Sequence, residues 1–217
     1  MIALHRVRFD ASGPEGPTTL LHETTCSLTA PRTAVIGENG SGKTTLARVI
    51  GGLAKPTAGM VSAPERIGML FSNPSAQPIM PTVREDVALS LRGSGLSRGE
   101  IASRVEAALT RHDLLELADR ACHSLSSGQQ QRLALCAILI AEPDLVVADE
   151  PTSLLDLRHR RIVADRLLEP AAKQIVLVTH DLDLAARCDE AVLVVAGRIA
   201  AQGRPAEVIA RYEDSLA

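Results

Sequence analysis

Short apolar runs alternate with segments of helical spacing along most of the chain. Three runs have the length and continuity of strands buried on both faces of a sheet: residues 32–36, 145–148 and 175–178. Helices are expected after all three, at residues 45–50, 157–168 and 182–187, and residues 191–195 and 198–202, which flank Gly197, are interpreted as a hairpin. Strands that alternate with helices predict an α/β fold with a mainly parallel sheet, whose ligands bind at the carboxyl edge.

The N-terminal segment has a different pattern, in which two candidate strands follow one another without a helix between them. Residues 2–9 alternate between apolar and polar positions, and residues 20–28 form a second candidate strand. Between them lies ASGPEGPTT, residues 11–19, which we interpret as a turn cluster. Residues 54–63 are punctuated by Pro and Gly, and no strand is assigned there. We therefore expect two strands ahead of the strand at residues 32–36.

The middle of the chain interrupts the alternation with consecutive helical patterns. Ser97 and Glu100 form the capping box S-x-x-E, and apolar residues then recur on one helical face. A second short helix is expected at residues 113–120. We interpret residues 75–140, approximately, as a helical subdomain inserted into one domain of residues 1–217, whose core is residues 1–74 and 141–217.

Composition favours a globular domain without a membrane span. The chain has 217 residues, of which 46% are apolar, but it contains no run of about 18 apolar residues that would cross a bilayer. Its net charge is −3 and its basic residues are spread out, which argues against a nucleic-acid partner. The first residues, MIALHRVRFD, lack the layout of a secretion signal, so we expect a cytoplasmic protein.

The cysteines and most histidines carry no metal-ligand or nucleophile pattern. Four cysteines lie far apart without C-x-x-C spacing, and we interpret them as buried free thiols. Five histidines match no motif and are interpreted as surface or cap residues: His5, His22, His112, His123 and His159.

Residues 37–44 read GENGSGKT, a full match to the phosphate-binding pattern G-x-x-x-x-G-K-[ST]. A predicted strand precedes the motif and a predicted helix follows it. Its glycines let successive N–H groups point at a polyphosphate, and the dipole of the helix favours the same anion. Lys43 can reach the β- and γ-phosphates, and Thr44 can offer its hydroxyl to Mg²⁺. The predicted nucleotide-binding residues are Gly37, Glu38, Asn39, Gly40, Ser41, Gly42, Lys43, Thr44 and Thr45.

Two further motifs are candidates for the same chemistry. Asp149 ends the predicted strand at residues 145–148, where a phosphate-loop fold holds Mg²⁺, and Glu150 is placed to orient and deprotonate a water. A surface Asp–Glu pair is the alternative interpretation. In LSSGQQQR, residues 125–132, Ser127 and Gly128 can begin a helix whose N–H groups suit a γ-phosphate. Helix physics alone favours an ordinary capped helix there.

Together these motifs resemble those of ATP-binding cassette (ABC) ATPases. GENGSGKT, LSSGQ, VVADEP, SLLD at residues 153–156 and VLVTHD at residues 176–181 occur in the family's order and cover nearly the whole chain. The resemblance implies a P-loop NTPase with an ABC-type core and an inserted helical subdomain. In that core, a mainly parallel sheet is accompanied by a small antiparallel N-terminal β subdomain. The resemblance also implies Mg²⁺-dependent ATP hydrolysis, with two ATP molecules held between two copies of the chain.

The resemblance assigns roles to the motif residues. Glu150 is implied as the general base, while His180 and Lys43 contact the phosphates, His180 also contacting the attacking water. Asp156 is implied at the interface between the copies. The residues implied to contact the γ-phosphate bound by the other copy are Ser127, Gly128 and Gln129.

Two positions depart from the family pattern. The family places an aromatic residue that stacks on adenine where this chain has Ala11, so Phe9, or no residue, replaces that contact. The family's F-Q-N-P has its glutamine replaced by Ser72, which is too short to reach Mg²⁺ and the attacking water. We expect Gln77, or a water, to compensate, and we assign Ser72 and Gln77 to coupling with a partner.

Residues 71–91, FSNPSAQPIMPTVREDVALSL, are similar to a run found in energy-coupling factor (ECF) importers. That resemblance implies a peripheral ATPase on the cytoplasmic face of the membrane. Its implied partners are a second copy, a transmembrane scaffold subunit and a small substrate-binding membrane subunit. The compact form most resembles the ATPase of the biotin system. A cobalt, nickel or other ECF importer and a non-transport ABC ATPase are the alternatives.

Overall fold

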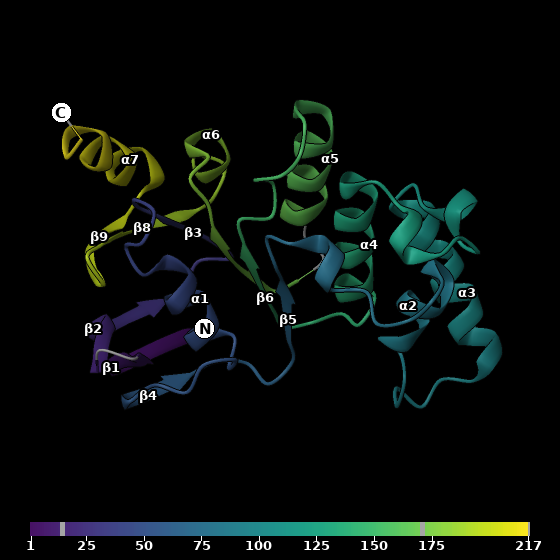
Figure 1. Cartoon of the computed structure of the whole chain (residues 1–217), viewed down its shortest axis with the longest axis horizontal. Coiled ribbons are helices and arrows are strands. Elements are labelled where there is room, and N and C mark those ends of the chain that lie inside the picture. The colour runs from purple at the N-terminus through teal and green to yellow at the C-terminus, as the bar shows by residue number, and fades with distance from the viewer. Residues whose placement is uncertain (14–15, 170–171, 217) are drawn as a thin grey trace. The chain divides into compact units, whose positions relative to one another are not determined.

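The structure, a computed structural model, describes residues 1–13, 16–169 and 172–216 of the chain. These residues divide into two compact units. The first unit comprises Met1–Met69, Asp144–Glu150 and Lys173–Ala217, and the second comprises Leu70–Pro143 and Pro151–Ala172. Figure 1 shows the helices and strands of both units.

A six-stranded sheet contains most strands of the first unit. The strands are β3 (Arg32–Ile36), β5 (Ile67–Leu70), β6 (Leu145–Asp149), β7 (Gln174–Val178), β8 (Glu190–Val195) and β9 (Arg198–Gly203). Their order is β5-β6-β7-β3-β8-β9; the run from β6 to β8 is parallel, and β9 is antiparallel to β8 (Figure 1). The parallel strands are almost completely buried, as their unbroken apolar sequences predict. The helices of this unit are α1 (Lys43–Ile50), α6 (Leu182–Ala185) and α7 (Pro205–Asp214).

A second, antiparallel sheet confirms the expected N-terminal β subdomain but extends further than predicted. It consists of β1 (Ile2–Gly13), β2 (Gly16–Leu28) and β4 (Ala58–Ser62), in the order β2-β1-β4. The turn cluster predicted at residues 11–19 was wrong, because Ala11 pairs with Thr18 and the strands continue nearly to their connection. Residues 14 and 15 lie outside the described part of the chain. Pairing with a neighbouring strand here overrides local turn propensity.

Strand β4 was not predicted, and Gly59 shows why its sequence is unusual for a strand. Gly59 has φ +81°, and a Cβ there would overlap the backbone of Arg6. Glycine therefore permits the close pairing of β4 with β1, although glycine lowers the strand propensity of the segment.

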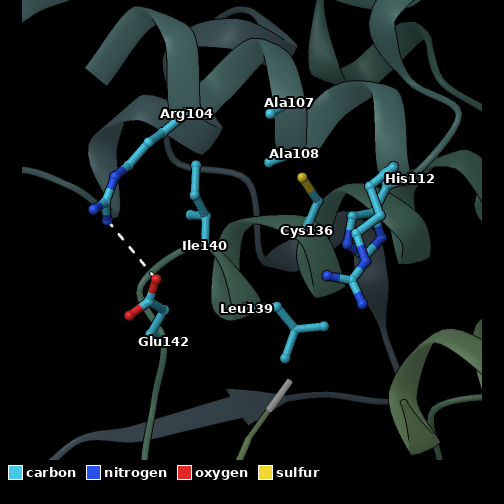
Figure 2. Close-up of a pocket in the computed structure, with 9 residues that line it drawn as sticks. Arg104, Ala107, Ala108, His112, Cys136, Leu139, Ile140 and Glu142 are labelled. Atoms are coloured by element: carbon cyan, nitrogen blue, oxygen red, sulfur yellow. Dashed lines mark ion pairs between the residues drawn. The ribbon is translucent and has the colours of Figure 1, made fainter. Parts of the chain in front are cut away.

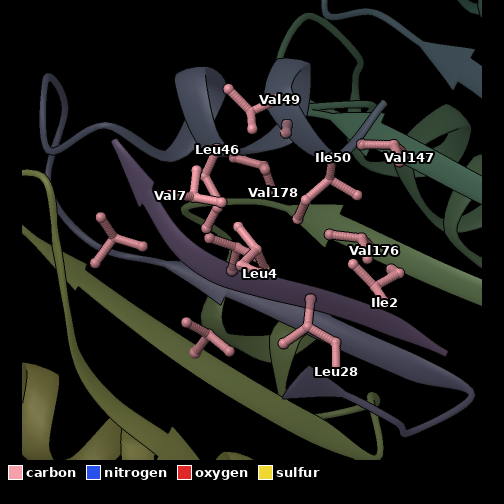
Figure 3. Close-up of a cluster of buried hydrophobic side chains, with 14 of the residues drawn as sticks. Ile2, Leu4, Val7, Leu28, Leu46, Val49, Ile50, Val147, Val176 and Val178 are labelled. Atoms are coloured by element: carbon pink, nitrogen blue, oxygen red, sulfur yellow. The ribbon is translucent and has the colours of Figure 1, made fainter. Parts of the chain in front are cut away.

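Helix α1 packs into the hydrophobic core of the first unit. Its Leu46, Val49 and Ile50 are at most 2% exposed. They belong to one cluster with residues of both sheets, among them Leu4 and Val178 (Figure 3). This packing fixes the position of the helix that starts immediately after the predicted phosphate loop.

The second unit is helical. Its helices are α2 (Val83–Leu89), α3 (Arg98–Arg111), α4 (Ser127–Leu139) and α5 (Leu157–Leu168), with 3₁₀ turns at Pro74–Ala76, Leu115–Leu117 and Cys122–Ser124. The predicted capping box of Ser97 and Glu100 is confirmed at the start of α3. The helix predicted at residues 113–120 was wrong: only the 3₁₀ turn forms there, and Asp113 has a left-handed φ of 53° that breaks the helix.

The described residues include no helix with the length and apolar character needed to span a bilayer. All four cysteines are free thiols, and three are buried, whereas Cys26 is partly exposed. Burial raises the pKa of Cys136 to about 12. A cavity of about 610 Å³ is lined by residues of α3 and α4, including Cys136 and His112 (Figure 2).

Candidate functional site

The loop between β3 and α1 has the conformation that an anion-binding loop requires. Gly37, Gly40 and Gly42 have φ values of 142°, 81° and 105°. A Cβ on Gly37 would overlap the carbonyl oxygen of Val194, and one on Gly42 would lie 2.8 Å from that of Leu20. Only glycine fits at these two positions. Glu38, Asn39 and Gly40 are exposed at the loop, whereas Ser41, Thr44 and Thr45 are buried or half-buried.

Lys43 lies across this loop and is only 6% exposed. Its Nζ donates hydrogen bonds of 2.8 Å to the carbonyl oxygens of Gly37 and Glu38. Burial lowers the pKa of Lys43, while the charges of Glu150 and Asp149 oppose that shift. The loop therefore holds a cation next to N–H groups at the positive end of α1, which together suit a polyphosphate.

Thr44 and Asp149 bring two hard oxygen donors together at the carboxyl end of β6. Thr44 Oγ1 donates to Asp149 Oδ1 at 3.1 Å. Asp149 is 7% exposed, and burial raises its pKa against the opposing effects of Thr44, Arg48 and Lys43. A hydroxyl and a carboxylate are the ligands that Mg²⁺ prefers, and a divalent cation would stabilise the buried carboxylate. The donor set therefore fits Mg²⁺.

Glu150 and His180 meet where the neighbouring strands β6 and β7 end. Glu150 Oε2 lies 2.7 Å from His180 Nδ1. The backbone of Glu150 has a left-handed φ of 51°, and its N–H donates to Val178 O at 2.9 Å. Such strained non-glycine residues occur preferentially at functional sites. A carboxylate oriented by an imidazole is suited to accept a proton from water.

The first turn of α4, in the second unit, is capped so that two N–H groups remain for an anion. Ser126 Oγ accepts from Gln129 N–H at 3.4 Å, and Gln129 Oε1 accepts from Ser126 N–H at 2.9 Å. Gln130 N–H donates to Ser126 O at 2.8 Å. Within the described chain, the backbone N–H groups of Ser127 and Gly128 have no acceptor.

Comparison with known proteins decides the family. Residues 25–153 match the family model described as ABC transporter. The chain belongs to this family. As an ABC ATPase, it is 40% identical to the biotin transport ATP-binding protein BioM of Rhizobium etli, over 97% of this chain and 99% of that protein. It is 38% identical to the energy-coupling factor transporter ATP-binding protein EcfA1 of Bacillus licheniformis, over 84% of this chain and 71% of that protein.

Solved structures agree with this assignment. The ABC ATPase fold matches cbiO1 of Clostridium perfringens, described as part of the ABC transporter complex cbiONQ, with a TM-score of 0.84 and 30% identity over 98% and 92% of the two chains. It also matches the cassette MJ0796, solved as a dimer in a post-hydrolysis state bound to ADP and Pi, with a TM-score of 0.84 and 27% identity over 94% and 99%. The predicted family, fold class and ATPase activity are confirmed.

His112 of this ABC ATPase is the C-terminal cap residue of α3, as the assignment to a surface or cap position allows, and it is buried, with only 3% of its surface exposed. For His159, the same assignment misses a contact with another helix. His159 packs against Gly128 of the signature motif LSSGQ, where an added Cβ would lie 2.5 Å from its ring. The sequence gives no sign of the contact between His159 and Gly128, because the two residues belong to different helices.

The segment that departs from the family pattern has its own local bonding. Gln77 Oε1 accepts a hydrogen bond of 3.0 Å from the backbone N–H of Phe71. Asn73 caps the short 3₁₀ turn that follows by accepting from Ser75 N–H at 3.2 Å. Ala11 lies within β1, opposite Thr18.

Proposed function

We propose that this chain is the ATPase subunit of an ECF-type importer and that its cargo is biotin. The observation that carries this proposal is the 40% identity to BioM over nearly the full length of both chains. The EcfA1 relatives support the ECF type without specifying a cargo. We further propose that both units act together as one ABC ATPase domain of residues 1–217.

In this proposal the motif residues act on ATP held between two copies. The loop of residues 37–45 and Lys43 bind the phosphates, and Thr44 and Asp149 hold Mg²⁺, which would neutralise developing phosphate charge. Glu150 accepts the proton of the attacking water, and His180 orients Glu150. The other copy contributes Ser127, Gly128 and Gln129, and Asp156 lies at the interface.

The proposed partners are membrane proteins. A transmembrane scaffold subunit would receive the coupling segment that contains Ser72 and Gln77, and a small membrane subunit would bind the cargo. The chain would then sit peripherally on the cytoplasmic face of the membrane. An ECF importer of cobalt or nickel is the second candidate, because the resemblance of residues 71–91 to ECF importers does not specify a cargo.

Purification of the tagged chain from its native membranes tests this proposal. We expect it to co-purify with a scaffold protein and a small membrane protein, and we expect vesicles that contain the complex to accumulate labelled biotin when ATP is supplied. Lys43→Ala is the control that should abolish uptake while the complex remains assembled. Uptake of Co²⁺ or Ni²⁺ but not biotin would exclude the biotin assignment, and recovery with soluble proteins alone would exclude the importer.

A further inference from the structure

His159 fills the space between the signature glycine and the carboxylate at the start of α5. A Cβ added to Gly128 would lie 2.5 Å from His159 Cδ2, 2.6 Å from Cγ and 3.1 Å from Nε2. These distances are shorter than ordinary van der Waals separation, so the ring lies directly against the glycine. The first turn of α4 therefore rests on the imidazole of His159.

The ring is held in place by one carboxylate. His159 Nδ1 lies 2.8 Å from Asp156 Oδ2, and the backbone N–H of His159 donates to Asp156 Oδ1 at 2.9 Å. Because a carboxylate accepts only, Nδ1 carries the proton in the neutral ring, and this fixes both the tautomer and the orientation of the imidazole. The hydrogen bonds from His159 lower the pKa of Asp156, so the carboxylate remains ionised at neutral pH.

We propose that His159 is a positioning residue for ATP hydrolysis. The ring of His159 sets the position of the Gly128 N–H. Because Asp156 holds the ring, His159 also couples the position of this N–H to Asp156, the residue assigned to the interface between the two copies. This inference rests on the proposed function, in which Gly128 contacts the γ-phosphate bound by the other copy. A donor displaced by about 1 Å can cost about 100-fold in rate. With the ring absent, α4 can move toward α5, and the N–H loses its fixed position.

Variants of His159, assayed in the complex that the tagged chain forms, test the proposal. His159→Ala should lower kcat for ATP about 10- to 100-fold and change KM less than about threefold, because the phosphate loop that binds ATP is intact. His159→Asn keeps a planar side chain that can donate to Asp156, and it should recover most of the rate. His123→Ala is the matched control, since His123 is an exposed histidine of the same unit. An unchanged kcat in His159→Ala, or no recovery in His159→Asn, would overturn the assignment.

A double-mutant cycle tests the contact independently of catalysis. Gly128→Ala should lower the melting temperature by several degrees in the parent, because its methyl group meets the ring. In the His159→Ala background, where the ring is absent, the same change should lower it much less. Equal losses in both backgrounds would show that the ring does not rest on Gly128. Glu150→Gln separates the two proposals: if it abolishes hydrolysis while His159→Ala does not, the proposed function stands and only the positioning role fails.

Discussion

Lowering the pH from 7 to 4 should destabilise this protein through one buried histidine. His112 ends α3 and lies beside Cys136 in the cavity that Figure 2 shows. Its Nδ1 has no hydrogen-bond partner among the described residues. Burial lowers the pKa of His112 from 6.5 to about 4, and the charges of Arg166 and Arg111 add to the shift against Glu169 and Asp113.

The size of the effect follows from the shift. A folded-state pKa below the unfolded value gives stability that is present above pH 6.5 and is lost as the pH falls toward 4. At about 1.4 kcal/mol per pKa unit, the shift corresponds to about 3 kcal/mol. For a chain of this size, that loss lowers the melting temperature by roughly 6–12 °C. The carboxylates with depressed pKa values, such as Asp144 with a pKa of about 2, lose their contribution mainly at lower pH.

Urea unfolding between pH 7 and 4 measures the effect, with His112→Gln as the test variant and His123→Gln as the control. The parent and His123→Gln should lose free energy of unfolding along the same curve. His112→Gln is expected to start lower at pH 7, because glutamine fits the site less well, and to lose about 3 kcal/mol less across the range. The reasoning would be refuted if His112→Gln followed the slope of the parent.

Three other predictions concern the nucleotide site. Glu150→Gln keeps the shape of the side chain but not its basicity, so ATP hydrolysis should fall about 10²- to 10⁴-fold, whereas ATP binding, measured by equilibrium titration, should be retained. The control is Glu142→Gln, which changes an exposed glutamate and should have no effect on hydrolysis. Hydrolysis at the parental rate in Glu150→Gln would show that Glu150 is not the general base. Asp149→Asn removes a buried carboxylate whose pKa is raised by burial, so the nucleotide-free variant should melt at a higher temperature than the parent. Mg²⁺-ATP should raise the melting temperature of the variant less than it raises that of the parent. A lower melting temperature of the nucleotide-free variant would contradict this prediction. Ser72→Gln restores the family residue and should increase the rate of hydrolysis, and an unchanged rate and coupling would make position 72 a bystander.

The sequence predicts the parallel sheet well because its signal is local. Strands such as Leu145–Asp149 are buried on both faces, so their apolar character is continuous and visible without any knowledge of their neighbours. Strand β4 has no such signal, since Gly59 and its neighbours become a strand only through pairing with β1. Its existence depends on tertiary structure and could not be read from the segment itself.

The candidate site divides in the same way. The phosphate loop and Glu150 each follow a strand, and Asp149 is the last residue of β6, so their positions at one edge of the sheet follow from topology. The approach of Glu150 to His180 is a consequence of the adjacency of β6 and β7. By contrast, the contact of His159 with Gly128 depends on how α4 and α5 pack, and no spacing in the sequence specifies helix packing at that level of detail.

The motif glycines are required for two different physical reasons, and this difference decides which of them can be replaced. At Gly42 a side chain meets a left-handed φ and the backbone oxygen of Leu20, and no change of a neighbouring side chain removes either obstacle. At Gly128 the helical backbone accepts alanine, and the obstacle is the ring of His159. The stability lost in Gly128→Ala can therefore be recovered by a second substitution, whereas that lost in Gly42→Ala cannot.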